Sequence, residues 1–230
     1  MDMQCVILAG GLATRLRPLT EKIPKPLVPI NGRPFIHHQL KLLKSYGIAN
    51  ILILTGYLGK QIEDYLGDGS KLGLGINYSY EENPLGTGGS LKNAETMLKE
   101  AFLIVNGDTY LNLDYKELID YFYKRDKIGV MTVYSDSEKI APNNVKIDET
   151  NLVMGYNKKD DATMDCVDSG VMVFKKKIIN FIEPGRKISL EEDIFSRLIE
   201  NKELVAYPVK QRFYDIGTFE GLKLLEGILK

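Results

Sequence analysis

The first half of the chain alternates short apolar runs with segments of helical periodicity. Apolar runs bounded by glycine or polar turns predict buried strands, and apolar residues spaced three or four apart predict amphipathic helices. The run from Cys5 to Ala9 is the first predicted strand and ends at a glycine pair. Further strands are predicted at 51–55, 76–80, 102–105 and 129–134, and helices at 34–47, 58–66, 90–98 and 113–124. This order favours a doubly wound α/β fold, with a mostly parallel mixed sheet covered on both faces.

The second half of the sequence is richer in strand patterns. Strands are predicted at 145–147, 153–156, 170–174 and 204–207, before a closing helix at 218–229. Ser189 is expected to cap a helix over 191–200, with Glu192 completing a capping box. The sequence contains no repeat, low-complexity tract or linker. We therefore expect residues 1–230 to form a single domain whose β-rich second half completes the binding pocket.

Composition narrows the class of protein. The chain has 230 residues, with 30 Lys and Arg against 31 Asp and Glu, which argues against a broad basic surface for nucleic acid or anionic membrane. No apolar stretch approaches the ~18 residues of a membrane span, and the N-terminus lacks the basic region of a signal peptide. Cys5 and Cys166 are too few for a disulfide framework and lack the spacing of a zinc site, and Cys5 is expected in the core. We expect a cytoplasmic protein with no nucleic-acid or membrane partner.

The segment after the first strand combines glycines with cations. Gly10 and Gly11 let the backbone turn sharply and bring N–H groups close to a ligand, and such groups suit phosphate oxygens. The same segment supplies a hydroxyl and three positive charges, from Thr14, Arg15, Arg17 and Lys25. Neither the P-loop pattern nor GxGxxG occurs in the chain, so this is not a standard ATPase loop or a dinucleotide fingerprint. We predict that the segment binds phosphates.

Two further features fall at the ends of predicted strands, where ligands bind in open parallel sheets. The loop 81–90 is rich in glycine and carries Glu81, which could accept hydrogen bonds from a base or a ribose; a solvated turn explains this loop equally well. Asp108 lies three residues beyond the predicted strand 102–105, a place where an Asp is often only a helix cap or turn residue. Paired with another carboxylate it becomes a Mg²⁺ site, and Asp215 is its natural partner, because carboxylate oxygens hold Mg²⁺ over substrate phosphates.

Taken together, these motifs resemble the sugar-phosphate nucleotidylyltransferases, over nearly the whole chain. The resemblance depends on LAGG-x-x-TRLRPLT from Leu8, then PKPL at 24–27, PLGTGG at 84–89, NGD at 106–108 and DIGT at 215–218, in the order of the family. It implies a Rossmann-like nucleotide-diphospho-sugar transferase fold. It also implies that the protein converts an NTP and a sugar 1-phosphate to an NDP-sugar and pyrophosphate, with Mg²⁺ as cofactor.

The resemblance also implies roles for individual residues. Arg15, Lys25 and Asp108 would be catalytic, with Arg15 on the triphosphate and Lys25 near the α-phosphate and the sugar phosphate. Asp108 and Asp215 would hold the metal. The nucleotide site would comprise Leu8, Ala9, Gly10, Gly11, Thr14, Glu81, Gly86 and Thr87. The sugar site would comprise Asn144, Asn157, Lys158, Asp168 and Gly170.

The sequence departs from the family pattern at several positions. Ala13 stands where many members have glycine. Asn157 replaces the usual Glu, Asp168 replaces the usual Asn, and 143–144 is Asn-Asn where a Tyr-Gly or similar pair is common. The last three departures lie on the sugar side, which argues against a common glucose-type substrate and leaves the nucleotide half intact.

The short family members that this chain resembles most, through PLGTGG and the stretch 188–194, are guanylyltransferases for D-glycero-α-D-manno-heptose 1-phosphate. Mannose-1-phosphate guanylyltransferases and N-acetylmuramate-1-phosphate uridylyltransferases are similar as well. Glu81 could accept both N1–H and N2–H₂ of guanine, which favours GTP. Such short domains often form homodimers.

Two alternatives of other kinds remain at this point. Regulatory relatives bind nucleotides without catalysis, but they usually lose the signature lysine or a metal carboxylate, and this chain retains Lys25, Asp108 and Asp215. A glycosyltransferase would require a DxD motif after a strand, and the sequence Asp-Thr-Tyr at 108–110 lacks the second Asp.

Overall fold

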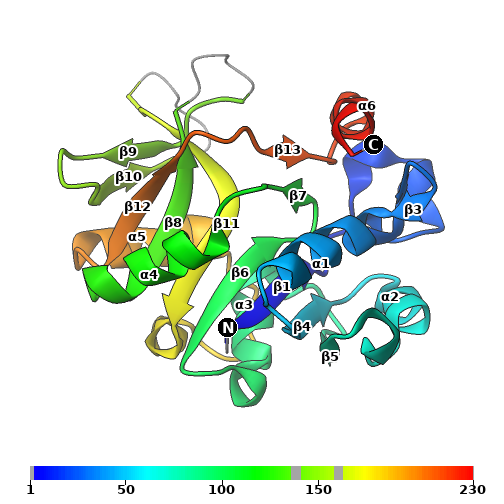
Figure 1. The fold of residues 1–230 in the computed structure, drawn as a ribbon. Coiled ribbons are helices and arrows are strands. Elements are labelled where there is room, and N and C mark those ends of the chain that lie inside the picture. The colour runs from blue at the N-terminus through cyan, green and yellow to red at the C-terminus, as the bar shows by residue number, and fades with distance from the viewer. Residues whose placement is uncertain (1–2, 136–140, 158–162, 230) are drawn as a thin grey trace.

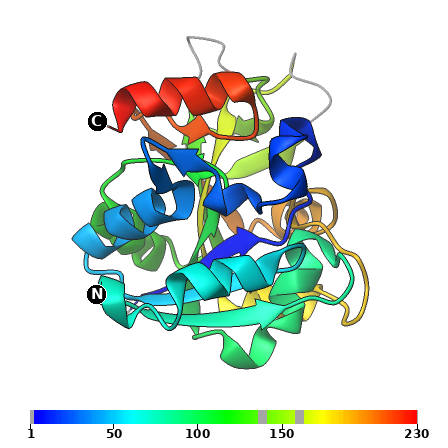
Figure 2. The ribbon, with the colours of Figure 1, turned by 90° about the vertical axis from the view of Figure 1, so that its right-hand side faces the viewer.

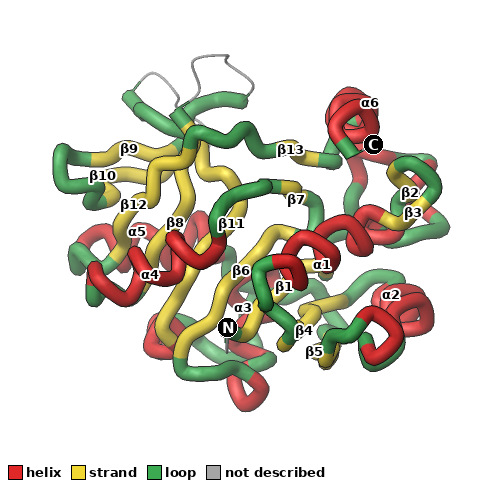
Figure 3. Tube along the Cα trace, in the orientation of Figure 1, coloured by secondary structure: helices red, strands yellow, loops and turns green. Residues whose placement is uncertain are grey.

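A seven-stranded mixed sheet lies at the centre of the computed structural model, which describes residues 3–135, 141–157 and 163–229 (Figures 1 and 3). Its strands follow the order β12 (Leu204–Val209), β8 (Gly129–Tyr134), β11 (Val167–Lys175), β6 (Ala101–Asn106), β1 (Gln4–Ala9), β4 (Asn50–Thr55) and β5 (Gly75–Tyr80). β11 runs antiparallel to both of its neighbours, whereas the four remaining strand pairs of the sheet are parallel. The predicted mostly parallel mixed sheet is confirmed.

Each central strand sends alternate side chains into two separate cores. On β1, Cys5 and Ile7 enter one core and Val6 enters the other, and all three are fully buried. Alternation with a period of two is a property of extended backbone, so each strand needs cover on both faces. The first face is covered by α1 (Phe35–Ser45), α2 (Gly59–Leu66) and α4 (Tyr115–Arg125). The second is covered by α3 (Gly86–Asn93), the 3-10 segment Lys176–Phe181 and α5 (Phe195–Glu200).

A third, smaller core fixes the segment between β1 and α1. Leu222 and Leu225 of α6 (Phe219–Ile228) pack against Leu16, Val28 and other apolar residues of that segment. In Figures 1 and 2 the red helix α6 lies beside the blue segment that contains β2 (Pro29–Ile30) and β3 (Arg33–Pro34). The C-terminal helix therefore supports the loop that carries the predicted phosphate-binding cations.

Two short antiparallel ribbons complete the fold. β7 (Thr109–Tyr110) pairs with β13 (Tyr214–Asp215), which joins the end of β6 to the C-terminal part of the chain. β9 (Val145–Ile147) pairs with β10 (Val153–Tyr156), and both strands have the bounds predicted from the sequence. Short helical turns occupy Thr14–Leu16, Leu19–Glu21, Lys25–Leu27, Ser70–Leu72, Glu95–Met97 and, as a π-helical turn, Leu190–Ile194. Within the described ranges, none of the helices combines the length and apolar character needed to cross a bilayer.

The structure corrects the expected start of α3. The prediction began this helix at residue 90, after the glycines, but the helix begins at Gly86 and includes them. The N–H groups of Gly88 and Gly89 donate to the carbonyl of Ile188, at 2.8 and 3.1 Å, so a distant backbone segment satisfies the helix N-terminus. A Cβ on Gly89 would lie 2.6 Å from the carbonyl oxygen of Arg186. The glycines are therefore explained by close packing of two chain segments.

The expected capping box at Ser189 is only half formed. The hydroxyl of Ser189 accepts the Glu192 N–H at 3.2 Å, as predicted. The Ser189 N–H, however, donates to the carboxylate of Asp193 at 2.8 Å, one residue beyond the expected Glu192. The wider π-helical turn over Leu190–Ile194 accounts for the shift.

Candidate active site

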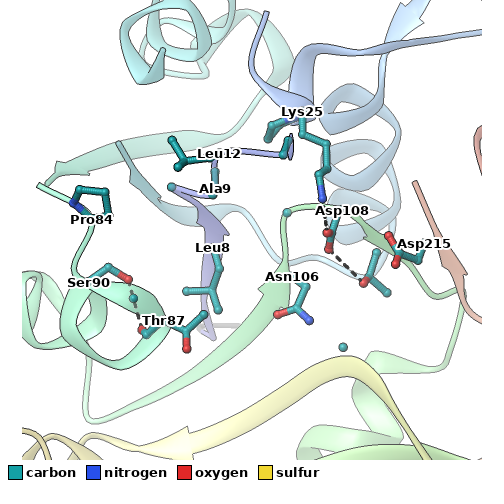
Figure 4. Close-up of a pocket in the computed structure, with 18 of the residues that line it drawn as sticks. Leu8, Ala9, Leu12, Lys25, Pro84, Thr87, Ser90, Asn106, Asp108 and Asp215 are labelled. Carbon is teal, nitrogen blue, oxygen red and sulfur yellow. Dashed lines mark hydrogen bonds and ion pairs between the residues drawn. The ribbon is translucent and has the colours of Figure 1, made fainter. Parts of the chain in front are cut away.

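A pocket of about 670 Å³ lies at the carboxyl-terminal ends of β1, β5 and β6 (Figure 4). Fourteen residues singled out in the sequence line it: Leu8, Ala9, Gly10, Gly11, Thr14, Arg15, Lys25, Glu81, Gly86, Thr87, Asp108, Asp168, Gly170 and Asp215. The wall also contains residues to which sequence reasoning gave no role, among them Leu12, Pro84, Ser90, Asn106, Lys187, Glu191 and Phe213. Arg17, one of the three cations of the first loop, is not among the described residues of the wall.

The first loop is anchored by Leu16, which is fully buried in the core beneath α6. Ala13 adopts a left-handed backbone conformation, with φ 49° and ψ 41°, where its Cβ is unfavourable. The hydroxyl of Thr20 donates to the Ala13 carbonyl at 2.7 Å and holds this turn. Arg15 lies two residues after Ala13, and 65% of its side chain is exposed. The loop thus presents its arginine to the pocket from a fixed base.

Lys25 and the two acidic residues meet at one side of the pocket. Lys25 Nζ lies 2.7 Å from Asp108 Oδ2 and donates to it. The β7–β13 ribbon pairs Thr109 with Asp215, and the Ile216 N–H donates to the Asp108 carbonyl at 2.9 Å. Figure 4 shows Asp215 beside Asp108. Two carboxylates far apart in the sequence are therefore neighbours because a short ribbon aligns their backbones.

Partial burial raises the pKa of Asp215, and the neighbouring Asp108 carboxylate raises it further. The Gly217 N–H, which donates to Asp215 Oδ1 at 2.6 Å, acts in the opposite direction, as do Lys25 and Arg15. Two half-buried carboxylates that repel each other suit a divalent cation, which removes the repulsion. No group of three or more metal-ligating side chains occurs within the described residues. Two carboxylates alone still fit Mg²⁺, which commonly takes its remaining ligands from substrate phosphates and water.

Glu81 lies in the pocket between two glycines. Its Oε2 accepts the Leu85 N–H at 3.1 Å, and burial raises the pKa of its carboxyl. A Cβ on Gly10 would lie 2.7 Å from Glu81 Oε1, and one on Gly56 would lie 2.9 Å from the same atom. The two glycines therefore create the space that the carboxylate occupies. Gly56 follows β4 directly and had no role in the sequence analysis.

The second glycine loop is tied to the segment around residue 190. The Thr87 hydroxyl donates to Glu191 at 2.7 Å and accepts the Leu190 N–H at 2.8 Å, and Ser189 also donates to Glu191 at 2.8 Å. The hydroxyl of Thr87 is thus engaged within the protein. Its donor and one of its two acceptor sites are used within the protein, so towards a nucleotide this hydroxyl can only accept one further hydrogen bond.

On the expected sugar side, Asp168 and Gly170 line the pocket. Asp168 accepts the Gly170 N–H at 2.9 Å and the Tyr156 hydroxyl at 3.3 Å. Burial, and secondarily the Asp168 charge, raises the pKa of Tyr156. Gly170 has φ 79°, and a Cβ there would lie 2.7 Å from the Thr109 hydroxyl. Sequence reasoning missed that the Tyr156 hydroxyl holds Asp168, because a strand pattern does not show which tyrosine hydroxyl donates to a site residue.

The remaining sugar-side residues do not form the described pocket wall. Asn144 accepts the Asp168 N–H at 2.8 Å, so it lies behind Asp168. The Asn157 N–H donates to the Asn144 carbonyl at 2.9 Å, so Asn157 is connected to Asp168 through Asn144. Lys158 lies outside the described residues. The structure brings Asp168 and Gly170 to the pocket and leaves the other predictions as they stand.

Comparisons with known proteins agree with this geometry. The family model described as nucleotidyl transferase matches residues 4–226. A mannose-1-phosphate guanylyltransferase from Mycobacterium tuberculosis is 34% identical, covering 95% of this chain and 62% of its own length. A D-glycero-alpha-D-manno-heptose 1-phosphate guanylyltransferase from Aneurinibacillus thermoaerophilus is 31% identical, and the match covers 94% of this chain and 93% of that relative's length. The chain therefore spans about three fifths of the first relative and nearly all of the second.

Solved structures show the same relationship. The crystal structure of HddC from Yersinia pseudotuberculosis is similar, with a TM-score of 0.87, 31% identity and coverage of 99% of this chain and 100% of its own. The structure of HddC complexed with GMP-PN has a TM-score of 0.85, with the same identity and coverage. The model match over residues 4–226 and these relatives establish that the chain belongs to the nucleotidyl transferase family.

Proposed function

We propose that this chain transfers a nucleotidyl group from an NTP, with GTP expected, to a sugar 1-phosphate of the heptose or mannose type. The products are an NDP-sugar and pyrophosphate. The observation that carries the proposal is the ion pair of 2.7 Å between Lys25 and Asp108, with Asp215 beside it, in a pocket of about 670 Å³. The names of the relatives from Mycobacterium tuberculosis and Aneurinibacillus thermoaerophilus support the substrate class.

The chemistry requires no covalent intermediate on the protein. An oxygen of the sugar phosphate attacks the α-phosphorus in line. A new P–O bond forms as the bond to the oxygen bridging the α- and β-phosphates breaks, and pyrophosphate leaves with that electron pair. Positioning and neutralisation of charge supply most of the rate in such transfers. Arg15 binds the triphosphate. When the substrates bind, the Lys25 ammonium leaves the Asp108 carboxylate and binds oxygens of the α-phosphate and of the sugar phosphate.

Asp108 and Asp215 would hold Mg²⁺. When bound, the ion supplies positive charge that neutralises the phosphates of the substrate. Lys25 is a cation of the protein itself beside these carboxylates, with only 15% of its side chain exposed. Its low exposure keeps it from being screened by water, so its charge acts strongly on a phosphate nearby.

The nucleotide is proposed to occupy the side of the pocket formed by the first loop and the loop 81–90. Glu81 is the candidate for base recognition, because a carboxylate can accept hydrogen bonds from N1–H and N2–H₂ of guanine. The similarity to HddC, whose structure contains GMP-PN, supports a guanine nucleotide. The proposed nucleotide residues are Leu8, Ala9, Gly10, Gly11, Thr14, Glu81, Gly86 and Thr87.

The sugar is proposed to occupy the opposite side, against Asp168 and Gly170. Asp168 accepts hydrogen bonds from sugar hydroxyls, and Asn144 and Asn157 support it from behind. Lys158 is proposed to contact the sugar-side phosphate. The protein is expected in the cytoplasm, where NTPs and sugar phosphates are available. Short domains of this kind often form homodimers, and light scattering on purified protein tests whether this one does.

Release of pyrophosphate tests the proposal directly. Purified protein is assayed with each of the four NTPs, and with dTTP, against heptose, mannose, glucose and N-acetylmuramate 1-phosphates, with Mg²⁺ and with EDTA. Preference for GTP with a heptose or mannose 1-phosphate, lost in EDTA, is the expected result. A clear preference for UTP or dTTP would contradict the guanylyltransferase assignment. Tight NTP binding without turnover of any sugar phosphate would indicate a regulatory protein instead.

A further inference from the structure

A buried glutamine lies directly beneath the turn that carries Asp108. Gln39 belongs to α1, is 2% exposed and is not part of the pocket wall. Its Nε2 donates to the Asn106 carbonyl at 2.9 Å and to the Thr109 carbonyl at 2.6 Å. These are the residues at either end of the Asn-Gly-Asp-Thr turn. Since both partners are acceptors, the amide nitrogen and not the oxygen must face them.

We infer that Gln39 is a positioning residue that sets the place of the Asp108 carboxylate by joining the two ends of its turn. The inference rests on the proposed function for its kinetic consequences only. Other contacts fix the centre of the turn: the Gly107 N–H donates to the Leu8 carbonyl at 3.0 Å, and the Ile216 N–H donates to the Asp108 carbonyl at 2.9 Å. Gln39 adds a restraint on the carbonyls of Asn106 and Thr109, which flank Gly107 and Asp108.

The other side-chain atom of Gln39 strengthens the inference. Among the described residues, no donor lies within hydrogen-bonding distance of its buried Oε1. An unpaired buried acceptor is costly, and an apolar residue of similar size would avoid that cost. A glutamine at this position is therefore explained by its two donated bonds. Both bonds act on one turn, and that turn carries one of the two carboxylates beside Lys25.

The chain offers a matched control at the opposite end of β1. Gln4 is 4% exposed and also bridges backbone groups, donating to the Met97 carbonyl at 3.0 Å and accepting the Lys99 N–H at 2.9 Å. Gln4 lies at the start of β1, whereas the pocket lies at its end. Gln4→Met and Gln39→Met therefore each remove two side-chain hydrogen bonds to the backbone, and only Gln39→Met removes them from the turn beneath the pocket.

The test combines kinetics with two measurements that need no turnover. In Gln39→Met we expect kcat to fall about tenfold to a hundredfold, because small displacements of catalytic groups have effects of that size. KM for the nucleotide should change less than about threefold, since Gln39 does not itself line the pocket and its side chain donates to the backbone carbonyls of Asn106 and Thr109. Hydrogen–deuterium exchange should rise in the peptide spanning 103–111, and Mn²⁺ should bind more weakly, as followed by the signal of free Mn²⁺ in electron paramagnetic resonance. Gln4→Met should change none of these.

Gln39→Glu provides a second variant that preserves shape. When ionised, the introduced carboxyl faces two carbonyl oxygens without a proton to donate, and when protonated it can donate one hydrogen bond. The ratio of variant to wild-type kcat should therefore rise as the pH falls. Unchanged exchange and unchanged Mn²⁺ binding in both Gln39 variants would overturn the inference, whatever the substrates turn out to be. Absence of turnover in the wild type with altered exchange and Mn²⁺ binding in Gln39→Met would contradict the proposed function alone.

Discussion

Lys25 and Asp108 are 83 residues apart in the sequence, and Lys25 Nζ donates to Asp108 Oδ2 at 2.7 Å. Their side chains are only 15% and 27% exposed, so the pair differs from the solvated salt bridges of the surface. Each side chain holds the other in the pocket, and Figure 4 shows Asp108 beside Asp215.

Lys25→Ala and Asp108→Asn should each lower kcat by about a hundredfold or more, because each removes a charge that acts on the phosphates at close range. Circular dichroism should show both variants folded. Steady-state release of pyrophosphate is the measurement. Lys60→Ala serves as the control, since Lys60 forms an exposed ion pair with Glu63 on α2 and its side chain is 70% exposed. Near-full turnover of Lys25→Ala would contradict the proposed mechanism.

Asp215→Asn should abolish metal-dependent activity and raise Tm at neutral pH. The pKa of Asp215 is raised above its usual 3.8 by burial and by Asp108, so ionisation of Asp215 opposes folding at pH values above its folded-state pKa. The penalty disappears as the pH falls toward the unfolded-state value, and so should the gain in Tm. Thermal unfolding at pH 7 and pH 4 measures this.

The same substitution at an exposed carboxylate separates this effect from the loss of a charge as such. Asp64 on α2 has a side chain that is 65% exposed, and Asp64→Asn should leave both the activity and the pH dependence of Tm unchanged. A lower Tm for Asp215→Asn at pH 7 would show that Asp215 stabilises the fold, contrary to this account.

Gly56→Ala should weaken nucleotide binding, although Gly56 does not itself line the pocket. The added Cβ would lie 2.9 Å from Glu81 Oε1, so the carboxylate must move from the space between Gly10 and Gly56. We expect KM for GTP to rise about tenfold, which corresponds to the loss of one hydrogen bond from a charged group. Gly227→Ala is the control, because a Cβ at Gly227 meets nothing within 4 Å. An unchanged KM in Gly56→Ala would exclude Glu81 as a recognition residue for the base.

Ala13→Gly should retain or raise stability, although glycine usually destabilises. Ala13 has φ 49°, and a left-handed conformation costs a residue with a Cβ about 1–2 kcal/mol. Greater freedom of glycine in the unfolded chain offsets part of that gain. Urea unfolding should give a change between zero and about +1 kcal/mol for Ala13→Gly. Ala94→Gly should lose stability, because Ala94 is fully buried with φ −89°. A loss in Ala13→Gly equal to that in Ala94→Gly would refute the account of strain in this loop.

Several predicted strands match the structure, and these predictions depended only on near neighbours in the chain. The strands at 129–134, 145–147 and 153–156 have the predicted bounds, because apolar alternation and turn residues act over a few positions. Cys5 lies in the core as expected, and burial raises the pKa of its thiol. The start of α3 was wrongly predicted at residue 90, since the segment 186–188, which packs against the glycines of 86–89, is about a hundred residues away.

The sequence by itself determined the fold class, the order of the elements, the family motifs and the candidate charges Arg15, Lys25, Asp108 and Asp215. Tertiary structure alone decided which groups meet: the β7–β13 ribbon beside Lys25, the engagement of Thr87 with Glu191, and Gln39 beneath the turn of Asp108. The physical reason is that secondary structure follows from periodicity within a short window. Hydrogen bonds and ion pairs between distant side chains exist only once two segments have packed together.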